Sequence, residues 1–428
     1  MIGLSYVPLS KGVSLLREHT SEIVWRGRSL FLCGGCDDVL PFFRVSTISD
    51  VDSELESTAH SSGTRRVALA FEADEKTRQW AARRGARLLL PPQEVVSHVG
   101  DKTCLPEILE CANLRPIPSS LYEAGSYPDA KRILLEFDGA SVVVQRRANN
   151  LTGRGTWLVS DWRELSQVFA EWGEERLKVS RYIDGILLTI SGCVGHAQTI
   201  VSAISKQFVG TPRLTCFWGA HCGNQLIKSA ELGDQIAALC FDACKKVGDE
   251  LRRRGFLGVF GLDLLQSREN KVFVVEINPR LQSVSSLVNV AEIEAGMLPL
   301  PGVHLLSFLL EKMPLTTFAD APAVPPLSQV VLYARRKGFI SEAPESGRYR
   351  LEEGGLAPAV GPPSLRYLSN KEALVWSFVK SGEYAQEDTR LCVLQTRFHL
   401  AEQGSQSVLT DTALKWIDAL EALFKYLA

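Results

Sequence analysis

The sequence predicts a protein of the α/β plus α+β class with two or three domains. A strand–helix–strand rhythm runs through the first hundred residues, long helices alternate with strands up to about residue 315, and a stretch rich in proline and alanine, Leu315–Gln329, precedes a strand-rich remainder. The length of 428 residues fits this division at roughly 150 residues per domain. We expect an N-terminal α/β domain at 1–99, a central domain at 100–315 and a C-terminal domain at 316–428 that ends in a helix.

The N-terminal region has the pattern of a parallel, doubly wound sheet. "VALAF" at 67–71 is typical of a short buried strand, "EKTRQWAARR" of a helix closed by Gly85, and "ARLLL" of the next strand. "RSLFLCGG" at 28–35 indicates a further strand that ends in a glycine turn. No G-x-G-x-x-G motif follows it, so the sequence does not favour a dinucleotide site.

Composition and charge favour a cytoplasmic protein with small-molecule partners. The 47 basic and 49 acidic residues give a net charge of −2, which provides no overall field for nucleic acid or an anionic membrane. No apolar run reaches the roughly 18 residues of a transmembrane helix, and the first residues lack the apolar core of a signal peptide. The ten cysteines are scattered and are expected to be reduced. Cys33 and Cys36 have C-x-x-C spacing, but without a second pair a glycine turn is favoured over a zinc or redox site.

The segment "GVFGLDLLQSRENKVFVVEINPR" predicts a β-hairpin that sets two acids against each other. If Glu269 and Asn270 form a two-residue loop, Asp263 falls directly opposite Glu276. Asn278 then shares a sheet face with Glu276, because side chains alternate along a strand. A register slip of one residue would place the acids on opposite faces.

Opposed carboxylates require a neutralising partner, because like charges facing each other across a ladder are destabilising. Asp263, Glu276 and Asn278 carry the oxygen ligands that Mg²⁺ prefers, with water and phosphate completing its coordination shell. The alternative is a solvated hairpin whose acids point outward.

Three segments in this order resemble the ATP-grasp superfamily of carboxylate–amine ligases: "GDK" at Gly100–Lys102, "VVVQRRANNLTGRGTWLV" at Val142–Val159, and "GLDLLQSRENKVFVVEINPR" at Gly261–Arg280. The resemblance implies an ATP-grasp fold, with ATP held between two α+β subdomains and a nucleotide lid at about 100–185. The overall layout, including the tail "LTDTALKWIDALEALF", is also similar to bacterial secondary-metabolite peptide ligases of the pheganomycin type.

The resemblance also implies cofactors and roles. ATP would be bound with two Mg²⁺ ions, held by Asp263, Glu276 and Asn278. Glu276 and Arg280 would be catalytic, Arg280 by steadying the phosphate or acyl phosphate, and Lys102 would reach the ATP phosphates. Such roles suit phosphoryl transfer, which depends mainly on positioning and charge neutralisation.

The lid residues follow from the same resemblance. "ANNLTGRGTW" would fold over the phosphates, and the segment "LKVSRYIDG" at 177–185 would contact adenine, largely through its backbone. Gln145 stands where the superfamily usually has a lysine, with Arg146 and Arg147 next to it, and Leu187 stands where an acid usually contacts ribose. The candidate ATP-binding set is Lys102, Gln145, Arg147, Gly153, Arg154, Gly155, Lys178, Val179 and Arg181.

Two loop-like segments are candidates for the substrate pocket. "FWGAHCGN" at 217–224 supplies His221 and Asn224, and "YARRKG" at 333–338 supplies Arg335 and Arg336 as carboxylate partners. An exposed basic turn is the alternative for the two arginines. The expected reaction joins a carboxylic acid, activated as an acyl phosphate, to an amine. Ligases of this architecture are often dimers, so a homodimer is compatible with this assignment.

Two other functions remain open from the sequence. One is a biotin carboxylase-like enzyme that activates bicarbonate; it would need a separate carrier protein, because no "AMKM"-like segment occurs here. The other is a non-catalytic ATP-binding sensor that lost its lysine at Gln145.

Overall fold

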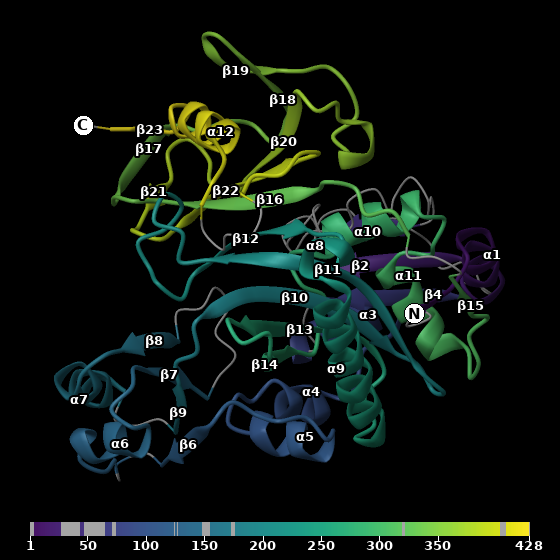
Figure 1. The fold of residues 1–428 in the computed structure, drawn as a ribbon. Coiled ribbons are helices and arrows are strands. Elements are labelled where there is room, and N and C mark those ends of the chain that lie inside the picture. Colours follow the sequence, from purple (N-terminus) through teal and green to yellow (C-terminus); the bar gives the residue numbers. More distant parts are fainter. Residues whose placement is uncertain are drawn as a thin grey trace.

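A computed structural model describes residues 4–26, 43–46, 65–70, 74–123, 125, 127–147, 155–172, 176–318, 322–402 and 408–427 (Figure 1). The predicted strand at 28–35, with Cys33 and Cys36, lies outside these ranges, as do Gly153 and Arg154. No helix in the described ranges is long and apolar enough to span a membrane.

The N-terminal region forms a parallel sheet, as its strand–helix rhythm predicts. Its strands, in spatial order, are β3 (Phe43–Ser46), β2 (Glu22–Arg26), β4 (Arg66–Ala70) and β5 (Arg87–Leu88), and every neighbouring pair is parallel. Helix α1 (Leu9–His19) precedes β2, and α3 (Glu75–Arg83) connects β4 to β5. Asp74 caps α3 by accepting a hydrogen bond from the Thr77 backbone N–H at 2.7 Å. Gly85, at φ 57°, adopts the left-handed conformation that ends the helix.

A second, antiparallel sheet lies at the lower left of Figure 1, and we call it the lid sheet. Its spatial order is β6 (Ser119–Tyr122), β9 (Leu177–Arg181), β7 (Val142–Arg146) and β8 (Thr156–Val159). Helices α6 (Ala130–Glu136) and α7 (Trp162–Glu171) cover one face, where Val142, Val144, Leu177 and Val179 join their apolar core. Because side chains alternate along a strand, Val143, Gln145, Lys178 and Ser180 lie on the other face, the inner face.

The largest sheet has ten strands, and all neighbouring pairs are antiparallel. In spatial order they are β14 (Val272–Asn278), β13 (Gly258–Ser267), β10 (Gly185–Val194), β11 (Thr199–Val209), β12 (His221–Leu226), β16 (Ser328–Tyr333), β22 (Arg390–Thr396), β20 (Glu372–Ser377), β18 (Gly347–Glu352) and β19 (Gly355–Pro358). Strands after the proline-rich stretch thus continue the sheet begun before it, through the β12–β16 pair. Strands before and after the expected domain boundary at 315/316 therefore belong to one sheet.

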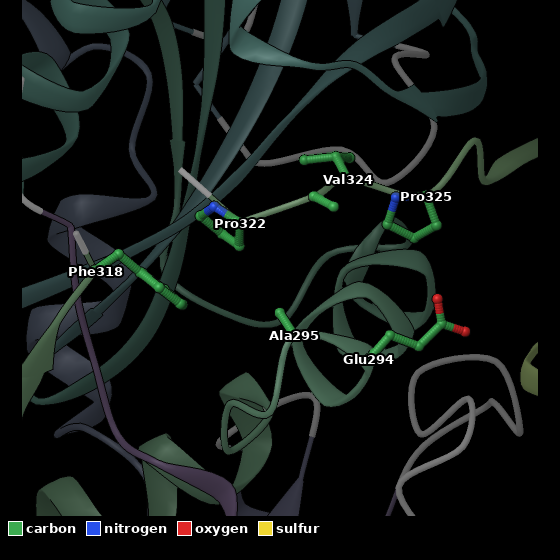
Figure 2. A pocket seen from close by; sticks show the side chains of 7 residues that line it. Glu294, Ala295, Phe318, Pro322, Val324 and Pro325 are labelled. Carbon is green, nitrogen blue, oxygen red and sulfur yellow. The ribbon is translucent and has the colours of Figure 1, made fainter. Parts of the chain in front are cut away.

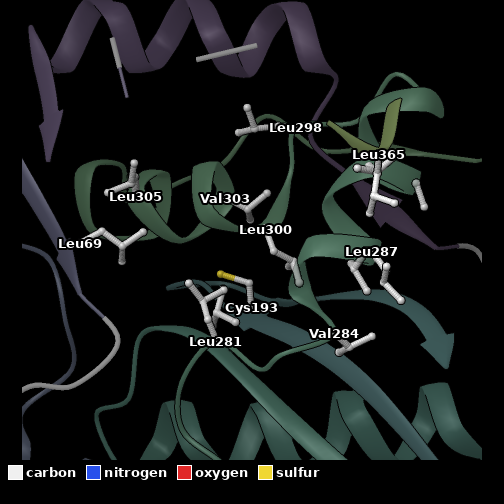
Figure 3. Packing of buried hydrophobic residues seen from close by; sticks show 14 of the residues in the cluster. Leu69, Cys193, Leu281, Val284, Leu287, Leu298, Leu300, Val303, Leu305 and Leu365 are labelled. Atoms are coloured by element: carbon white, nitrogen blue, oxygen red, sulfur yellow. The ribbon is translucent and has the colours of Figure 1, made fainter. Parts of the chain in front are cut away.

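Helices pack on this sheet through apolar side chains. Helix α9 (Asp234–Arg253) has a buried face, including Phe241 and Val247, that packs against apolar residues of β10 and β13. A second core gathers around α10 (Ser285–Glu294) and α11 (Leu300–Leu309), where Figure 3 shows Leu300 and Val303 close to Cys193 of β10. This core also contains Leu69 of the parallel sheet, so it connects the N-terminal region to the large sheet.

The remaining elements complete the fold. They are β1 (Ser5–Tyr6) paired with β15 (Thr316–Thr317), α4 (Gln93–Val99), α5 (Leu105–Cys111), α8 (Ser229–Leu232), the 3₁₀ helix at Leu365–Tyr367, the small sheet of β21 (Tyr384–Ala385), β17 (Gly338–Glu342) and β23 (Lys425–Tyr426), and α12 (Asp411–Glu421).

Candidate active site

The predicted acid pair is present in the β13–β14 hairpin. Asp263 is the cross-strand partner of Glu276, and Asn278 faces Gly261 two pairs further along. Asn278 follows Glu276 by two residues on the same strand, so the three predicted ligands share one sheet face.

The turn that produces this register differs from the prediction. The Ser267 backbone N–H donates to the Lys271 carbonyl at 2.8 Å, so the loop has three residues, 268–270, instead of two. Asn270 takes the left-handed conformation at φ 58°, which asparagine tolerates and which favours the longer loop. Val274 consequently pairs with Leu264 and not with Leu265. A register shift on β14 between the partners of Asp263 and Leu264 offsets the added residue and restores the Asp263–Glu276 pair.

Neutral donors surround the Asp263 carboxylate. Thr189 of β10 donates its hydroxyl to Oδ1 at 3.2 Å, and the amides of Gln282 and Asn278 donate to Oδ1 and Oδ2 at 3.2 and 3.1 Å. Burial, together with the negative charge of Glu276, raises the pKa of Asp263 to about 6. Repulsion between the two carboxylates therefore persists in part, and a bound cation would neutralise it.

Lys102 forms an ion pair with one of the two acids. Its ammonium lies 3.1 Å from Glu276 Oε2, and its side chain is only 4% exposed. The first and third predicted segments, "GDK" and the acid hairpin, are thus in direct contact.

The loop that carries Lys102 is fixed by Asp101. Oδ1 of Asp101 accepts hydrogen bonds from the backbone and the hydroxyl of Thr103 at 2.9 and 2.7 Å, and Oδ2 accepts one from Arg147 Nε at 2.7 Å. Despite partial burial, which opposes the change, these hydrogen bonds lower the pKa of Asp101. Arg147, a predicted ATP-binding residue, therefore joins the end of β7 to the "GDK" loop.

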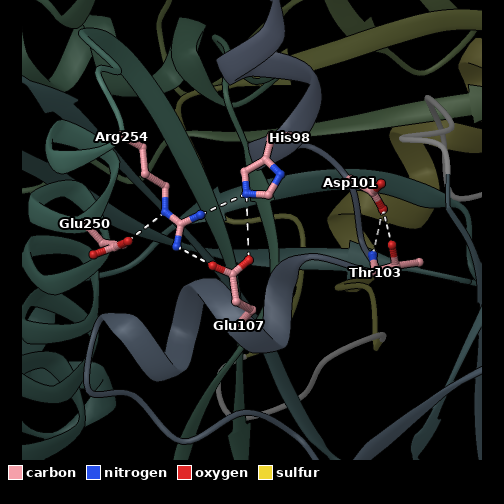
Figure 4. Close-up of polar contacts among 6 residues, drawn as sticks. All are labelled: His98, Asp101, Thr103, Glu107, Glu250 and Arg254. Carbon is pink, nitrogen blue, oxygen red and sulfur yellow. Dashed lines mark hydrogen bonds and ion pairs between the residues drawn. The ribbon is translucent and has the colours of Figure 1, made fainter.

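The helices on either side of this loop are braced against α9. In Figure 4, Arg254 lies between His98 of α4, Glu107 of α5 and Glu250 of α9, at 2.8, 2.7 and 2.6 Å. This cluster thus joins α4 and α5, the helices on either side of the "GDK" loop, to the end of α9.

Lys178, on the lid sheet, lies near Lys102 and Glu276. Lys178 of β9 is the cross-strand partner of Gln145 on β7, and both side chains are about 95% buried on the inner face. Burial, with the nearby positive charge of Lys102, lowers the pKa of Lys178 to about 8, while Glu276 acts in the opposite direction. Lys178 of the lid sheet therefore lies within electrostatic range of Lys102 and of Glu276 on the hairpin.

The other predicted lid residues lie elsewhere. The Val179 side chain points into the lid core, and Arg181 forms an ion pair with Asp138. The backbone carbonyl of Gly155 accepts a hydrogen bond from the Arg146 N–H at 3.0 Å. The roles of these residues toward ATP stay predictions.

A cationic region, formed by Arg280 and Arg390 around His221, adjoins Asn278 of the hairpin. Arg280 donates to Asn278 Oδ1 at 3.0 Å. His221 Nε2 lies 2.8 Å from Asn224 Oδ1, and the Asn224 amide donates to Thr189 Oγ1 at 3.5 Å, so both predicted substrate residues are connected to Asp263 through Thr189.

Arg390, at the start of β22, also belongs to this region, and no motif in the sequence indicates it. Burial, together with the charges of Arg390 and Arg280, lowers the pKa of His221 to about 4. Arg390 Nε is buried and has no hydrogen-bond partner among the described residues. Its cross-strand partner Tyr333 donates its hydroxyl to the His221 carbonyl at 2.8 Å.

Arg335 and Arg336 occupy an exposed turn after β16. The Arg336 guanidinium stacks on the Tyr426 ring at 4.3 Å, and within the described ranges neither arginine has a recorded contact with the residues above. The role of these two arginines as carboxylate partners stays a prediction.

A pocket of about 450 Å³ lies beside the proline-rich stretch, away from these groups (Figure 2). Its lining is largely apolar, with Phe318, Pro322 and Pro325 around Glu294. Glu294 is paired with Arg397 at 2.7 Å, so the pocket offers no free ionisable group.

Comparison with known families identifies the domain that holds the acid hairpin and the lid. A model of the ATP-grasp domain matches residues 99–284. This chain has an ATP-grasp domain. The match spans all three segments on which the sequence resemblance rested, and the ATP-grasp fold is confirmed. Comparison with curated proteins found no match.

Solved structures with the same fold cover nearly the whole chain. Carboxyaminoimidazole ribonucleotide synthase from Aspergillus clavatus, complexed with ATP, is 12% identical, with a TM-score of 0.59 over 94% of this chain and 99% of that one. The biotin carboxylase domain of 2-oxoglutarate carboxylase from Hydrogenobacter thermophilus, a dimer with MgADP and bicarbonate, is 12% identical, with a TM-score of 0.58 over 98% and 88%. Phosphoribosylamine–glycine ligase from Thermotoga maritima is 12% identical, with a TM-score of 0.58 over 95% and 97%. These structures share the ATP-grasp fold; the narrower similarity to pheganomycin-type ligases stays a prediction.

The candidate metal ligands fit Mg²⁺ by donor type. Two carboxylates and one amide share a face, and the acid pair lacks full charge compensation. The described part of the chain contains no cluster of three His, Cys, Asp or Glu side chains able to hold a metal. A metal here would therefore depend on phosphate and water oxygens for the rest of its shell.

Proposed function

We propose that this protein is an ATP-dependent ligase that activates a substrate carboxylate as an acyl phosphate and joins it to an amine. The observation that supports this most is the convergence of Lys102, Lys178 and Arg280 on the acid pair of the β13–β14 hairpin. Clustered cations next to paired carboxylates are suited to a magnesium-bound polyphosphate.

In the first step, a carboxylate oxygen of the substrate attacks the γ-phosphorus of ATP. The bond from that phosphorus to the bridging oxygen breaks, and ADP leaves with the electron pair. Asp263, Glu276 and Asn278 would hold Mg²⁺, which neutralises phosphate charge when bound. Lys102 and Arg280 stabilise the phosphoryl oxygens, Arg280 with a planar fork that matches them.

In the second step, the amine nitrogen attacks the carbonyl carbon of the acyl phosphate. The bond from carbon to the phosphate oxygen breaks, phosphate leaves with the electron pair, and it takes up the proton that the nitrogen loses. Arg390 and His221 lie beside Arg280, where they can orient the carboxylate for both steps. Positioning of this kind is a major part of catalysis in phosphoryl transfer.

The test measures ADP and phosphate release from ATP with panels of acids and amines, each acid assayed with and without amine. We expect ADP to form only with a suitable acid, and an amide product to appear when the amine is added. Absence of ADP with every pair, despite measurable ATP binding, would contradict the proposal and favour a non-catalytic ATP sensor.

A second candidate is activation of bicarbonate as the acid, because the structural neighbours include a biotin carboxylase domain with bound bicarbonate. The first step would be the same, with carboxyphosphate as its product. ADP release that depends on bicarbonate, and is stimulated by biotin in the absence of other acids, would favour this candidate.

A further inference from the structure

We propose that the Lys178 side chain, assisted by the neighbouring Gln145 amide, is the lid's binding group for the nucleotide phosphates, instead of a residue that meets adenine through its backbone. This inference rests on the proposed use of ATP, and it assigns a specific part of the nucleotide to a specific side chain of the lid.

The register of the lid sheet brings the two side chains together. Gln145 and Lys178 are directly paired on the antiparallel strands β7 and β9, and the next pair along is Val143 with Ser180. Cβ atoms of directly opposed residues lie about 4.5–5.5 Å apart, so the ammonium and the amide reach the same space. Helices α6 and α7 cover the opposite face, and on the inner face Lys178 lies within electrostatic range of Glu276 on the acid hairpin.

Polar groups on this inner face are buried and lack partners. Lys178 and Gln145 are 4% and 5% exposed, and neither side chain has a recorded hydrogen bond or ion pair within the described ranges. The Ser180 hydroxyl is also buried without a hydrogen-bond partner. Buried polar groups are normally satisfied, so the enclosed Ser180 hydroxyl, beside the unpaired Lys178 ammonium and Gln145 amide, indicates a ligand that would satisfy them.

The sign of the charge defines the ligand's chemistry. Lys178 lies near a second buried lysine, Lys102, whose ammonium is already paired with Glu276. Two neighbouring cations that share one carboxylate can accommodate further negative charge. A group with several anionic oxygens, such as a triphosphate, would contact both ammonium groups and the Gln145 amide.

The first experiment compares nucleotide binding by titration calorimetry, without turnover, in the wild type and in Lys178→Met. We expect the affinity for ATP to fall about 10- to 100-fold, as for loss of a charge-assisted contact, and the affinity for adenosine to stay unchanged. The unfolding temperature of the unliganded variant should equal or exceed that of the wild type, because the substitution removes an unpaired buried ammonium.

Lys206→Met is the matched control. Lys206 is also buried and its pKa is also lowered to about 8, but its ammonium donates to the Glu402 carbonyl at 2.7 Å. This variant should bind ATP like the wild type while its unfolding temperature falls.

A charge exchange tests the position directly. In the double variant Gln145→Lys with Lys178→Gln, the ammonium moves to the adjacent strand but stays on the inner face. We expect it to recover most of the ATP affinity that Lys178→Gln alone loses.

Equal losses of adenosine and ATP affinity in Lys178→Met would overturn the proposal and assign Lys178 to the base. A lowered unfolding temperature with unchanged ATP affinity would also overturn it, because the role would then be structural. Neither readout requires ligase activity, so failure of this proposal is distinguishable from failure of the proposed reaction.

Discussion

Asp263 and Glu276 face each other across the β13–β14 hairpin, and the Lys102 ammonium lies 3.1 Å from the second of these acids. A loop that follows α4, the hairpin and the inner face of the lid sheet thus meet at one pair of carboxylates. Two features determine the position of this pair. The turn has three residues, and a register shift on β14 compensates for the added residue.

Replacement of Glu276 by Gln should lower the rate of ADP formation by about 100-fold or more, because one of two charged ligands for the cation is lost and Lys102 loses its partner. Steady-state ADP release measures the effect. Glu269→Gln is the control on the same hairpin, since Glu269 is exposed at the loop and pairs with Lys271. A turnover rate in Glu276→Gln equal to that of Glu269→Gln would rule out the proposed role.

Gly261 should not tolerate a side chain. A Cβ at this position would lie 1.8 Å from Oε1 of Gln282, whose amide donates to Asp263. Gly261→Ala should therefore lower the free energy of unfolding by about 1–3 kcal/mol through overpacking and weaken Mg²⁺-dependent ATP binding. Gly347→Ala is the control, because a Cβ there meets no atom within 4 Å. Denaturant unfolding of both variants checks the prediction; equal stability would contradict it.

Arg390 should determine the affinity for the acid substrate. Its buried Nε lacks a partner among the described residues, and it lies near His221 beside Arg280. We expect Arg390→Met to raise the KM for the acid by about 10-fold or more with little change in the Kd for ATP. Arg335→Ala and Arg336→Ala should resemble the wild type. An increased KM in these two variants, with none in Arg390→Met, would favour the prediction made from the sequence.

Glu292 should reduce stability at neutral pH. Burial raises its pKa to about 7, against the opposing hydrogen bonds from Ser202 and the Leu300 N–H at 2.6 and 2.8 Å. Above its ordinary pKa the unfolded state releases this proton while the folded state keeps it, so its contribution makes stability fall as pH rises from about 4.5 to 7 and then level off.

Glu292→Gln mimics the protonated side chain and should remove this decline. We expect the variant to exceed the wild type in unfolding free energy by up to about 3 kcal/mol at pH 8 and to match it near pH 4.5. Glu294→Gln, on the same helix and paired with Arg397, should show no such gain at pH 8. A difference from the wild type that does not change with pH would contradict the raised pKa of Glu292.

Local sequence patterns were sufficient for several elements. The strand–helix rhythm around 67–90 predicted the parallel sheet, and alternation with a turn predicted the acid hairpin, because both depend on neighbouring residues. The Asp263–Glu276 pair was predicted correctly, although the loop was one residue longer than expected. Asn270 in the left-handed conformation and the register shift on β14 are not encoded by apolar alternation, so the pattern did not reveal them.

Contacts between residues far apart in the sequence could not be predicted from local patterns. Arg390 comes near His221 only because β22 joins β16 in the large sheet, and no local pattern around it indicates a site. Lys178 was assigned to the adenine contact from its place in the chain, whereas its pairing with Gln145 becomes visible only in the register of β7 and β9. In both cases tertiary pairing of strands determines which side chains meet.

We propose that Asp263 and Glu276 bind a divalent cation beneath the nucleotide phosphates. The most direct test of this site is electron paramagnetic resonance titration of Mn²⁺, as a substitute for Mg²⁺, with a non-hydrolysable ATP analogue in the wild type, Asp263→Asn and Glu276→Gln. We predict saturable Mn²⁺ binding that depends on the analogue in the wild type and is lost in both variants. Mn²⁺ binding of equal strength in all three proteins would rule out this cation site.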